Sequence, residues 1–148
     1  KLPFTRSTNH YASLGRSGRV ITSVQHPGSA IEIATPGAGS AEILAQGPSF
    51  WHPTCDASGE WIASDTNWPD TGLHLIHAPT GRYRVLCFTG TSGGHPQWQH
   101  AHPRMSPNAK YVVFDSDRTG GISHVYAAHI PDEFKRDLRE GHVKPHAA

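Results

Sequence analysis

A short stretch of the sequence concentrates side chains that bind metal ions. It reads "HPQWQHAHP" and lies just before "YVVF", and its candidate ligands are His95, Gln97, Gln99, His100 and His102. If "QHAHP" is extended, His100 and His102 point to the same face, because residues two apart in a strand share a face. Imidazole is the commonest protein ligand for metals, so this pair favours a divalent metal site. The alternative is a solvent-exposed loop, and the spacing alone leaves both interpretations open.

The two glutamines depend on how the chain bends. In a regular strand, neither Gln97 nor Gln99 shares a face with His100 and His102. The Gly and Pro residues of "GGHPQWQ" favour a bend that would bring one glutamine to the same site. Strand parity does not decide which of the two it is. His95 is interpreted as a loop residue.

Three segments of the chain resemble one another, and each opens with a histidine. They are "HYASLGRSGRVITSV", "HPTCDASGEWIASDT" and "HPRMSPNAKYVVFDSD", which begin at His10, His52 and His102. The starts lie 42 and 50 residues apart, close to the ~40–50-residue period of propeller blades. Equivalent positions on successive blades lie around one central axis. The repeat therefore predicts that these three histidines lie near one another.

Strand signals follow each repeat. Two strands across a Pro/Gly turn are expected in "SAIEIATPGAGSAEILA" and in "GLHLIHAPTGRYRVLCF", whereas "SHVYAAHI" supplies only one clear strand. Such units build four-stranded antiparallel blades. The sequence predicts an all-β fold, a partial β-propeller over residues 1–130 with blades at about 8–46, 50–91 and 98–130. Closed propellers have about four to eight blades, so we expect the remaining blades in a longer protein or in other copies of the chain.

The C-terminal residues 131–148 have a different pattern. "PDEFKRDLREG" places Pro131 at a helix start, acidic residues in the first turn and Gly141 at the end. We expect a short helix or tail here.

The composition argues against several classes of protein. A length of 148 residues suits one domain. With 13 basic and 12 acidic side chains, the net charge of +1 gives no reason to expect a nucleic-acid partner. No apolar run approaches the ~20 residues of a membrane helix, so no membrane contact is expected. Cys55 and Cys87 are too few for a disulfide framework; they are expected to be small buried hydrophobes and agree with a cytoplasmic location, the periplasm being the alternative.

Beside these patterns, the chain resembles the oligogalacturonate lyase family, polysaccharide lyases with a seven-bladed β-propeller. The resemblance rests on "GEWIASDTNWPDTGLHLIH" and "HPQWQHAHPRMSPNAKYVVFDSDRTGG" and covers roughly His10 to Tyr126. Its most specific parts are the Gln-x-x-His-x-His pattern and "DTNWPD". The segment "SPNAKYVVFDSDR" is shared with TolB-type propeller repeats in general. The family's catalytic arginine is expected upstream of Lys1, so the chain is expected to be an incomplete, C-terminal portion that is inactive alone.

The resemblance also implies a ligand set. A divalent metal, most often Mn²⁺, would be held by His52, Gln97, His100 and His102, which selects Gln97 over Gln99. Nitrogen and oxygen ligands without thiolate also suit Zn²⁺, Ni²⁺ or Fe²⁺. A further family histidine linked to catalysis falls on His10.

The implied activity is that of a carbon–oxygen lyase acting on short oligogalacturonides. It breaks them by β-elimination, giving unsaturated and 5-keto-4-deoxyuronate products of pectin degradation. A metal on the uronate carboxylate would make the neighbouring proton easier to remove. His10 would act as the base, or as a general acid/base partner of the missing arginine. Arg118 is the candidate contact for further carboxylates. Asp65, Thr66 and Asn67 are expected to form a polar turn that supports the metal ligand or the sugar hydroxyls.

Two further features leave alternatives open. Trp51, Trp68 and Trp98 flank the expected site and could stack on a sugar ring or pack between blades. The competing function is a non-enzymatic TolB-like propeller that binds a protein or a ligand. That alternative explains the repeat and "SDR" but not the ligand pattern.

Overall fold

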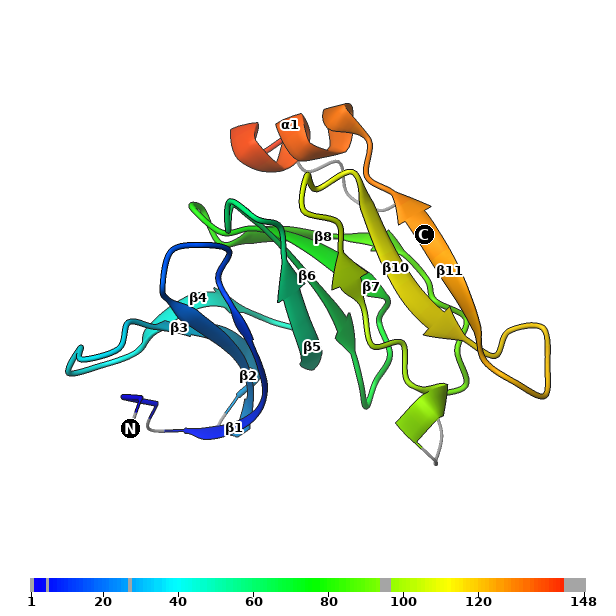
Figure 1. Ribbon diagram of the computed structural model, residues 1–148, viewed down its shortest axis with the longest axis horizontal. Coiled ribbons are helices and arrows are strands. Elements are labelled where there is room, and N and C mark those ends of the chain that lie inside the picture. The colour runs from blue at the N-terminus through cyan, green and yellow to red at the C-terminus, as the bar shows by residue number, and fades with distance from the viewer. Residues whose placement is uncertain (1, 5, 27, 94–96, 143–148) are drawn as a thin grey trace.

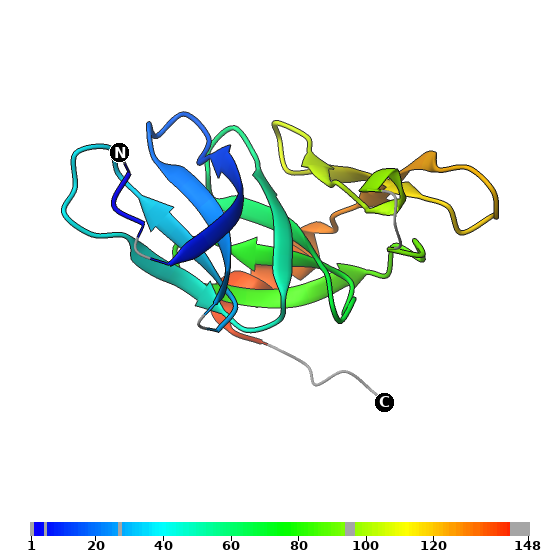
Figure 2. The same cartoon turned by 90° about the horizontal axis from the view of Figure 1, so that it is seen from below.

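The fold consists of three antiparallel β-sheets and one short α-helix (Figure 1). The structure, a computed structural model, describes residues 2–4, 6–26, 28–93 and 97–142. In both views of the ribbon, the sheets follow one another across the molecule in sequence order (Figures 1 and 2). The predicted all-β architecture with a short C-terminal helix is confirmed.

The first two sheets contain four strands each, in sequence order. The first comprises β1 (Ser7–Ser13), β2 (Val20–His26), β3 (Ala30–Ala34) and β4 (Glu42–Gln46). The second comprises β5 (Phe50–Cys55), β6 (Trp61–Thr66), β7 (Leu73–His77) and β8 (Arg82–Cys87). Tight polar turns permit this meander. In the first hairpin of each sheet, Gly18 and Gly59 have φ angles of 73° and 77°, a left-handed conformation that glycine adopts readily.

The third sheet has three strands rather than the four of a predicted blade. Its order is β11 (His124–His129), β10 (Tyr111–Ser116) and β9 (Arg104–Met105). The chain then enters α1 (Asp132–Glu140), which follows Pro131 and ends at Gly141 with φ 83°. Leu138 is buried and Phe134 packs against the core. Their four-residue spacing is helical rather than alternating, which explains why the described chain forms a helix after β11 instead of a fourth strand.

The second sheet is covered on both faces. Along β7, Leu73 and Leu75 belong to an apolar cluster shared with the third sheet and α1. The adjacent Ile76 belongs to a second cluster shared with the first sheet. Successive strand residues point to opposite faces, so one strand contributes to both cores. The three sheets are therefore stacked face to face.

The stacking brings together the first strand of each sheet. Strand β1 packs against β5, and β5 also contacts β9. The first residues of the first two predicted repeats, His10 and His52, lie within β1 and β5, and that of the third, His102, lies just before β9. The start of each repeat therefore lies beside the start of the next.

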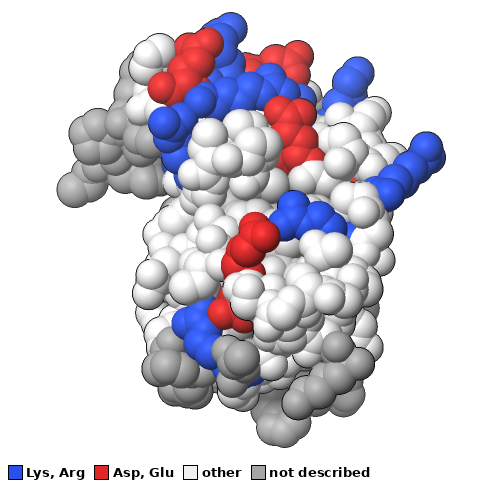
Figure 3. Space-filling model, turned by 90° about the vertical axis from the view of Figure 1, so that its left-hand side faces the viewer, with Lys and Arg blue, Asp and Glu red and all other residues white. Residues whose placement is uncertain are grey.

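The surface carries charges of both signs. On the face shown in Figure 3, basic and acidic side chains lie close together and no large area has a single sign. Arg19 pairs with Glu42 at 3.3 Å, and Arg139 pairs with Glu60 at 2.8 Å. Among the described residues, no helix is long and apolar enough to cross a membrane.

Candidate metal centre

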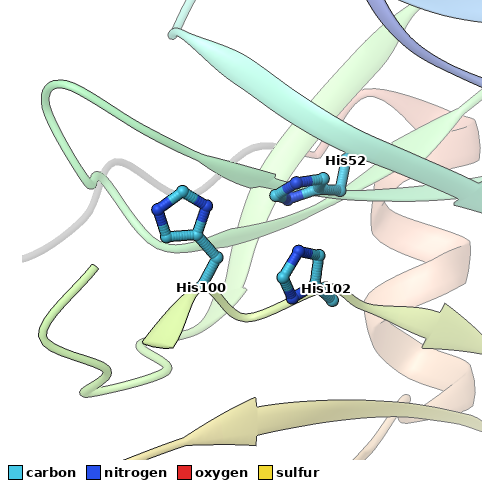
Figure 4. Close-up of side chains that lie close together, drawn as sticks. All are labelled: His52, His100 and His102. Carbon is cyan, nitrogen blue, oxygen red and sulfur yellow. The ribbon is translucent and has the colours of Figure 1, made fainter. Parts of the chain in front are cut away.

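Three histidines converge where the second and third sheets meet. His52 lies on β5, His100 follows the 3₁₀ turn η1 (Gln97–Gln99), and His102 lies just before β9. One ring nitrogen from each lies within 4.8 Å of the others. Figure 4 shows the three imidazoles gathered together from two separate segments. These residues are called the histidine site below.

The segment that carries two of these histidines is not an extended strand. His102 has a φ of 42°, and the N–H of His100 donates to the Gln97 carbonyl at 2.9 Å. The N–H of Asp115 donates to the Ala101 carbonyl at 2.8 Å and fixes the segment against β10. The rings of His100 and His102 are 5.8 Å apart between centroids. The predicted convergence is observed, but a bend and a turn produce it rather than strand parity.

A buried carboxylate orients His52. Asp65 accepts a hydrogen bond from the His52 backbone N–H at 2.7 Å and lies 2.7 Å from its ring Nδ1. Both side chains are buried. A carboxylate oxygen accepts hydrogen bonds, so Nδ1 is the donor in this contact and Nε2 is the ring nitrogen left for a metal. Metal-binding histidines are commonly held by such a carboxylate.

His10 lies beside the histidine site on the neighbouring sheet. Its ring centroid is 4.2 Å from that of His52 and 5.2 Å from that of Trp51. Burial, followed by the proximity of His52, lowers the pKa of His10 to about 4. The pKa of His102 is lowered for the same two reasons. Both imidazoles are therefore neutral at neutral pH and have a lone pair available for a proton or a metal.

The lowered pKa of His10 predicts that the metal-free protein loses stability in acid. Its ordinary pKa is 6.5 and its folded pKa about 4, so the unfolded chain binds an extra proton across that window and unfolding is favoured as the pH falls. Urea unfolding at several pH values should show this loss. His10→Gln should lose less stability over the same window; an unchanged pH dependence would contradict the assignment.

The remaining predicted ligand, Gln97, lies close to the site in the chain. It is the first residue of η1, and its side chain is exposed. Its backbone carbonyl is the acceptor for His100 described above. Its role as a fourth ligand stays a prediction. Gln99 is the last residue of the same turn, and His95 lies outside the described residues.

A polar cleft opens next to His100. It is small, with a volume of about 20 Å³, and is lined by Asn67, Asp70, Thr89 and Thr91 among others. Asn67 is buried, with its backbone N–H donating to the Ser49 carbonyl at 3.0 Å. Asn67 is therefore placed at a possible substrate surface, and its contact with substrate stays a prediction.

Arg118 joins two sheets. Its guanidinium donates to the backbone carbonyls of Phe88, at 3.2 Å, and of Thr89. It also lies over the ring of Tyr126, 4.6 Å from the centroid. These contacts give Arg118 a structural role between the second and third sheets. Its contact with a substrate carboxylate stays a prediction.

The sequence predicted that Asp65 belongs to a supporting polar turn. In the structure it lies on a strand and forms a specific pair with His52. Asp65 lies on β6, which pairs with β5, and the register is irregular between Phe50 and Pro53. That irregularity lets one carboxylate reach both the backbone and the ring of His52. The only sequence signal is the polar run "SDT" at the end of an apolar strand.

Comparison with known proteins supports the fold. No family model matches the sequence, and no curated protein sequence matches it. The chain is similar to an oligogalacturonate lyase in complex with manganese, with a TM-score of 0.75 and 20% identity over 87% of this chain and 36% of that one. For an oligogalacturonate lyase from Vibrio parahaemolyticus, the TM-score is 0.71 and the identity 21%, over 86% and 37% of the two chains.

A TolB structure from Acinetobacter baumannii has the same arrangement, with a TM-score of 0.64 and 17% identity over 86% of this chain and 31% of that one. The chain thus spans about a third of the length of these structures. At such identities the likeness concerns the fold alone. The predicted resemblance is confirmed at that level: this chain has the fold of a portion of a β-propeller, as found in oligogalacturonate lyase and TolB structures.

Proposed function

We propose that this chain is part of a metal-dependent lyase that cleaves short oligogalacturonides, such as digalacturonate, by β-elimination. The observation that carries the proposal is the histidine site, with its three ring nitrogens within 4.8 Å of one another. Its setting adds support, because the fold is shared with an oligogalacturonate lyase in complex with manganese. The chain spans only part of that structure, so the activity is proposed for the complete protein.

The residues of the histidine site fit a divalent cation. Two of the three side chains are buried and the third is half-buried. Asp65 presents the Nε2 lone pair of His52, and the lowered pKa of His102 keeps that ring neutral. Nitrogen ligands without thiolate suit Mn²⁺, Zn²⁺, Ni²⁺ and Fe²⁺. We propose Mn²⁺, with Gln97 as a fourth ligand.

The chemistry follows from the acidity of the substrate. The C5 proton of a uronate is α to a negatively charged carboxylate, which makes it hard to remove. A cation at the histidine site would neutralise that charge and make the C5–H bond more acidic. His10 accepts the C5 proton, the C4–O bond breaks, and the leaving oxygen takes up a proton. One product then carries a C4–C5 double bond and is the precursor of a 5-keto-4-deoxyuronate.

Other groups complete the proposed setting. Asn67 would contact sugar hydroxyls from the cleft, and Arg118 a second carboxylate. Further blades, from a longer chain or other copies, would close the ring. Cys55 and Cys87 are free, which agrees with a cytoplasmic location, the periplasm being the alternative.

Two measurements on one purified sample of the complete protein test this function. Metal analysis should find about one Mn²⁺ per chain after loading and dialysis. Incubation with digalacturonate should then produce the ultraviolet absorbance of an unsaturated uronide, and a chelator should abolish it. Metal binding without product would reject the lyase function. Absence of both would favour the TolB-like binding module.

Replacing Asp65 by asparagine should weaken metal binding by about 10- to 100-fold, the usual effect of removing such a supporting carboxylate. Asparagine keeps the size but loses the charge that fixes the His52 ring. Titration calorimetry with Mn²⁺ measures the effect. Asp132→Asn, an exposed carboxylate on α1, is the matched control and should bind as the wild type does. Equal affinity in both variants would show that Asp65 does not support a ligand.

A further inference from the structure

An indole lies exposed at the edge of the histidine site. The side chain of Trp68 is 70% exposed. Its ring centroid is 6.3 Å from that of His100. Trp61 shows the contrast, since it is 2% exposed and lies in the core between the second and third sheets. Packing between sheets therefore does not account for the position of Trp68.

The orientation of Trp68 is fixed despite its exposure. Trp51 meets it edge-on, with ring centroids 5.4 Å apart and an angle of 77° between the planes. The hydroxyl of Ser49 donates to the Trp68 carbonyl at 3.4 Å. Trp68 also has a φ of 50°, in a region that bulky residues rarely occupy and that recurs at functional sites. The ring is thus supported from one side and open on another.

Polar groups flank this indole. Asn67 and Asp70, its close neighbours in the chain, line the cleft beside His100 together with Thr89 and Thr91. Carbohydrate has apolar C–H faces and a rim of hydroxyls. A site for it therefore combines an open aromatic face with a few fixed polar groups. The segment from 67 to 70 provides both.

We infer that Trp68 is a stacking platform for the sugar ring that is joined to the uronate at the histidine site. This inference rests on the proposed function and adds a specificity-determining residue to it. Because Trp68 lies next to His100, a disaccharide that places one carboxylate at the histidine site can lay its second ring on the indole. A single galacturonate has no second ring. Trp68 therefore selects for substrates of two or more sugars.

The test is a binding experiment that does not require turnover. Wild type, Trp68→Ala and Trp68→Phe are loaded with Mn²⁺, and the affinities for galacturonate and digalacturonate are measured by calorimetry. Tyr111→Ala is the matched control, since Tyr111 is also exposed but lies on the outer face of the third sheet. Mn²⁺ affinity is measured for every variant to show that the histidine site is intact.

Trp68→Ala should bind digalacturonate about 10- to 100-fold more weakly, as for removal of an aromatic anchor, with Mn²⁺ and galacturonate affinities unchanged. Trp68→Phe should recover most of the loss, and Tyr111→Ala should match the wild type. Equal digalacturonate affinity in wild type and Trp68→Ala would overturn the inference and leave the proposed function standing. A wild type that binds Mn²⁺ but neither sugar would overturn both.

Discussion

Replacing His52, His100 or His102 by alanine is expected to lower the affinity for Mn²⁺ by more than about 100-fold, beyond the effect of losing a supporting carboxylate. Each residue supplies one of three nitrogens that lie within 4.8 Å of one another. A three-nitrogen site that loses one ligand retains only a pair. Calorimetric titration, or metal analysis after dialysis, measures the loss.

The same variants should also lose stabilisation by the metal. A ligand that binds only the folded state raises the melting temperature in proportion to the logarithm of its concentration over the dissociation constant. Wild type should therefore melt higher with Mn²⁺, and the three variants should not. His124→Ala is the control, because His124 is exposed on β11, away from the site. Full metal affinity in His52→Ala and His100→Ala would reject the site.

Replacing His10 by alanine is expected to reduce the rate of unsaturated product formation by about 10²- to 10⁴-fold, the usual contribution of a general base. The imidazole is neutral at neutral pH, since its pKa is lowered to about 4, and its ring centroid lies 4.2 Å from that of His52. It is therefore placed to accept a proton next to the metal-binding residues. Initial rates of the complete protein on digalacturonate measure the effect.

A metal measurement separates the role of His10 from that of a ligand. His10 is not one of the three residues whose nitrogens meet within 4.8 Å. His10→Ala should therefore retain the wild-type affinity for Mn²⁺ within a few-fold. A variant that loses both metal and activity would make His10 a ligand. A variant that keeps full activity would assign the proton transfer to another group.

The internal repeat made it possible to predict from the sequence that the histidines lie close together. His52 and His102 each open a repeat, and the first strands of successive sheets pack against each other. That relation depends on the stacking of sheets, which a repeat length of this size indicates. The all-β class could be predicted for a similar reason, from alternating strands and Gly/Pro turns.

The local geometry of the site could not be predicted in the same way. The 3₁₀ turn at Gln97–Gln99 and the left-handed φ of His102 depend on how this segment packs against β10, not on the parity of its residues. The two contacts that His52 makes to the accepting carboxylate of Asp65 depend on an irregular register between two strands. The contacts of Arg118 with backbone carbonyls just after β8 likewise depend on tertiary packing.

The end of the chain shows how a local pattern can override a repeat. Two complete four-stranded sheets suggest a fourth strand in the third. The segment after Ile130 instead has apolar residues four apart and acidic residues in its first turn, which favour a helix. Helix α1 then packs against β7 and β8 of the second sheet. The segment forms a helix rather than a fourth strand because the helix buries Leu138.

The central claim is that one divalent cation binds between His52, His100 and His102. Crystals of the Mn²⁺-loaded protein, measured at the manganese absorption edge, test it most directly. An anomalous difference peak should lie among the three imidazoles, with Nε2 of His52 facing it and Nδ1 still bonded to Asp65. A peak elsewhere, or none at all from metal-saturated crystals, would contradict the claim.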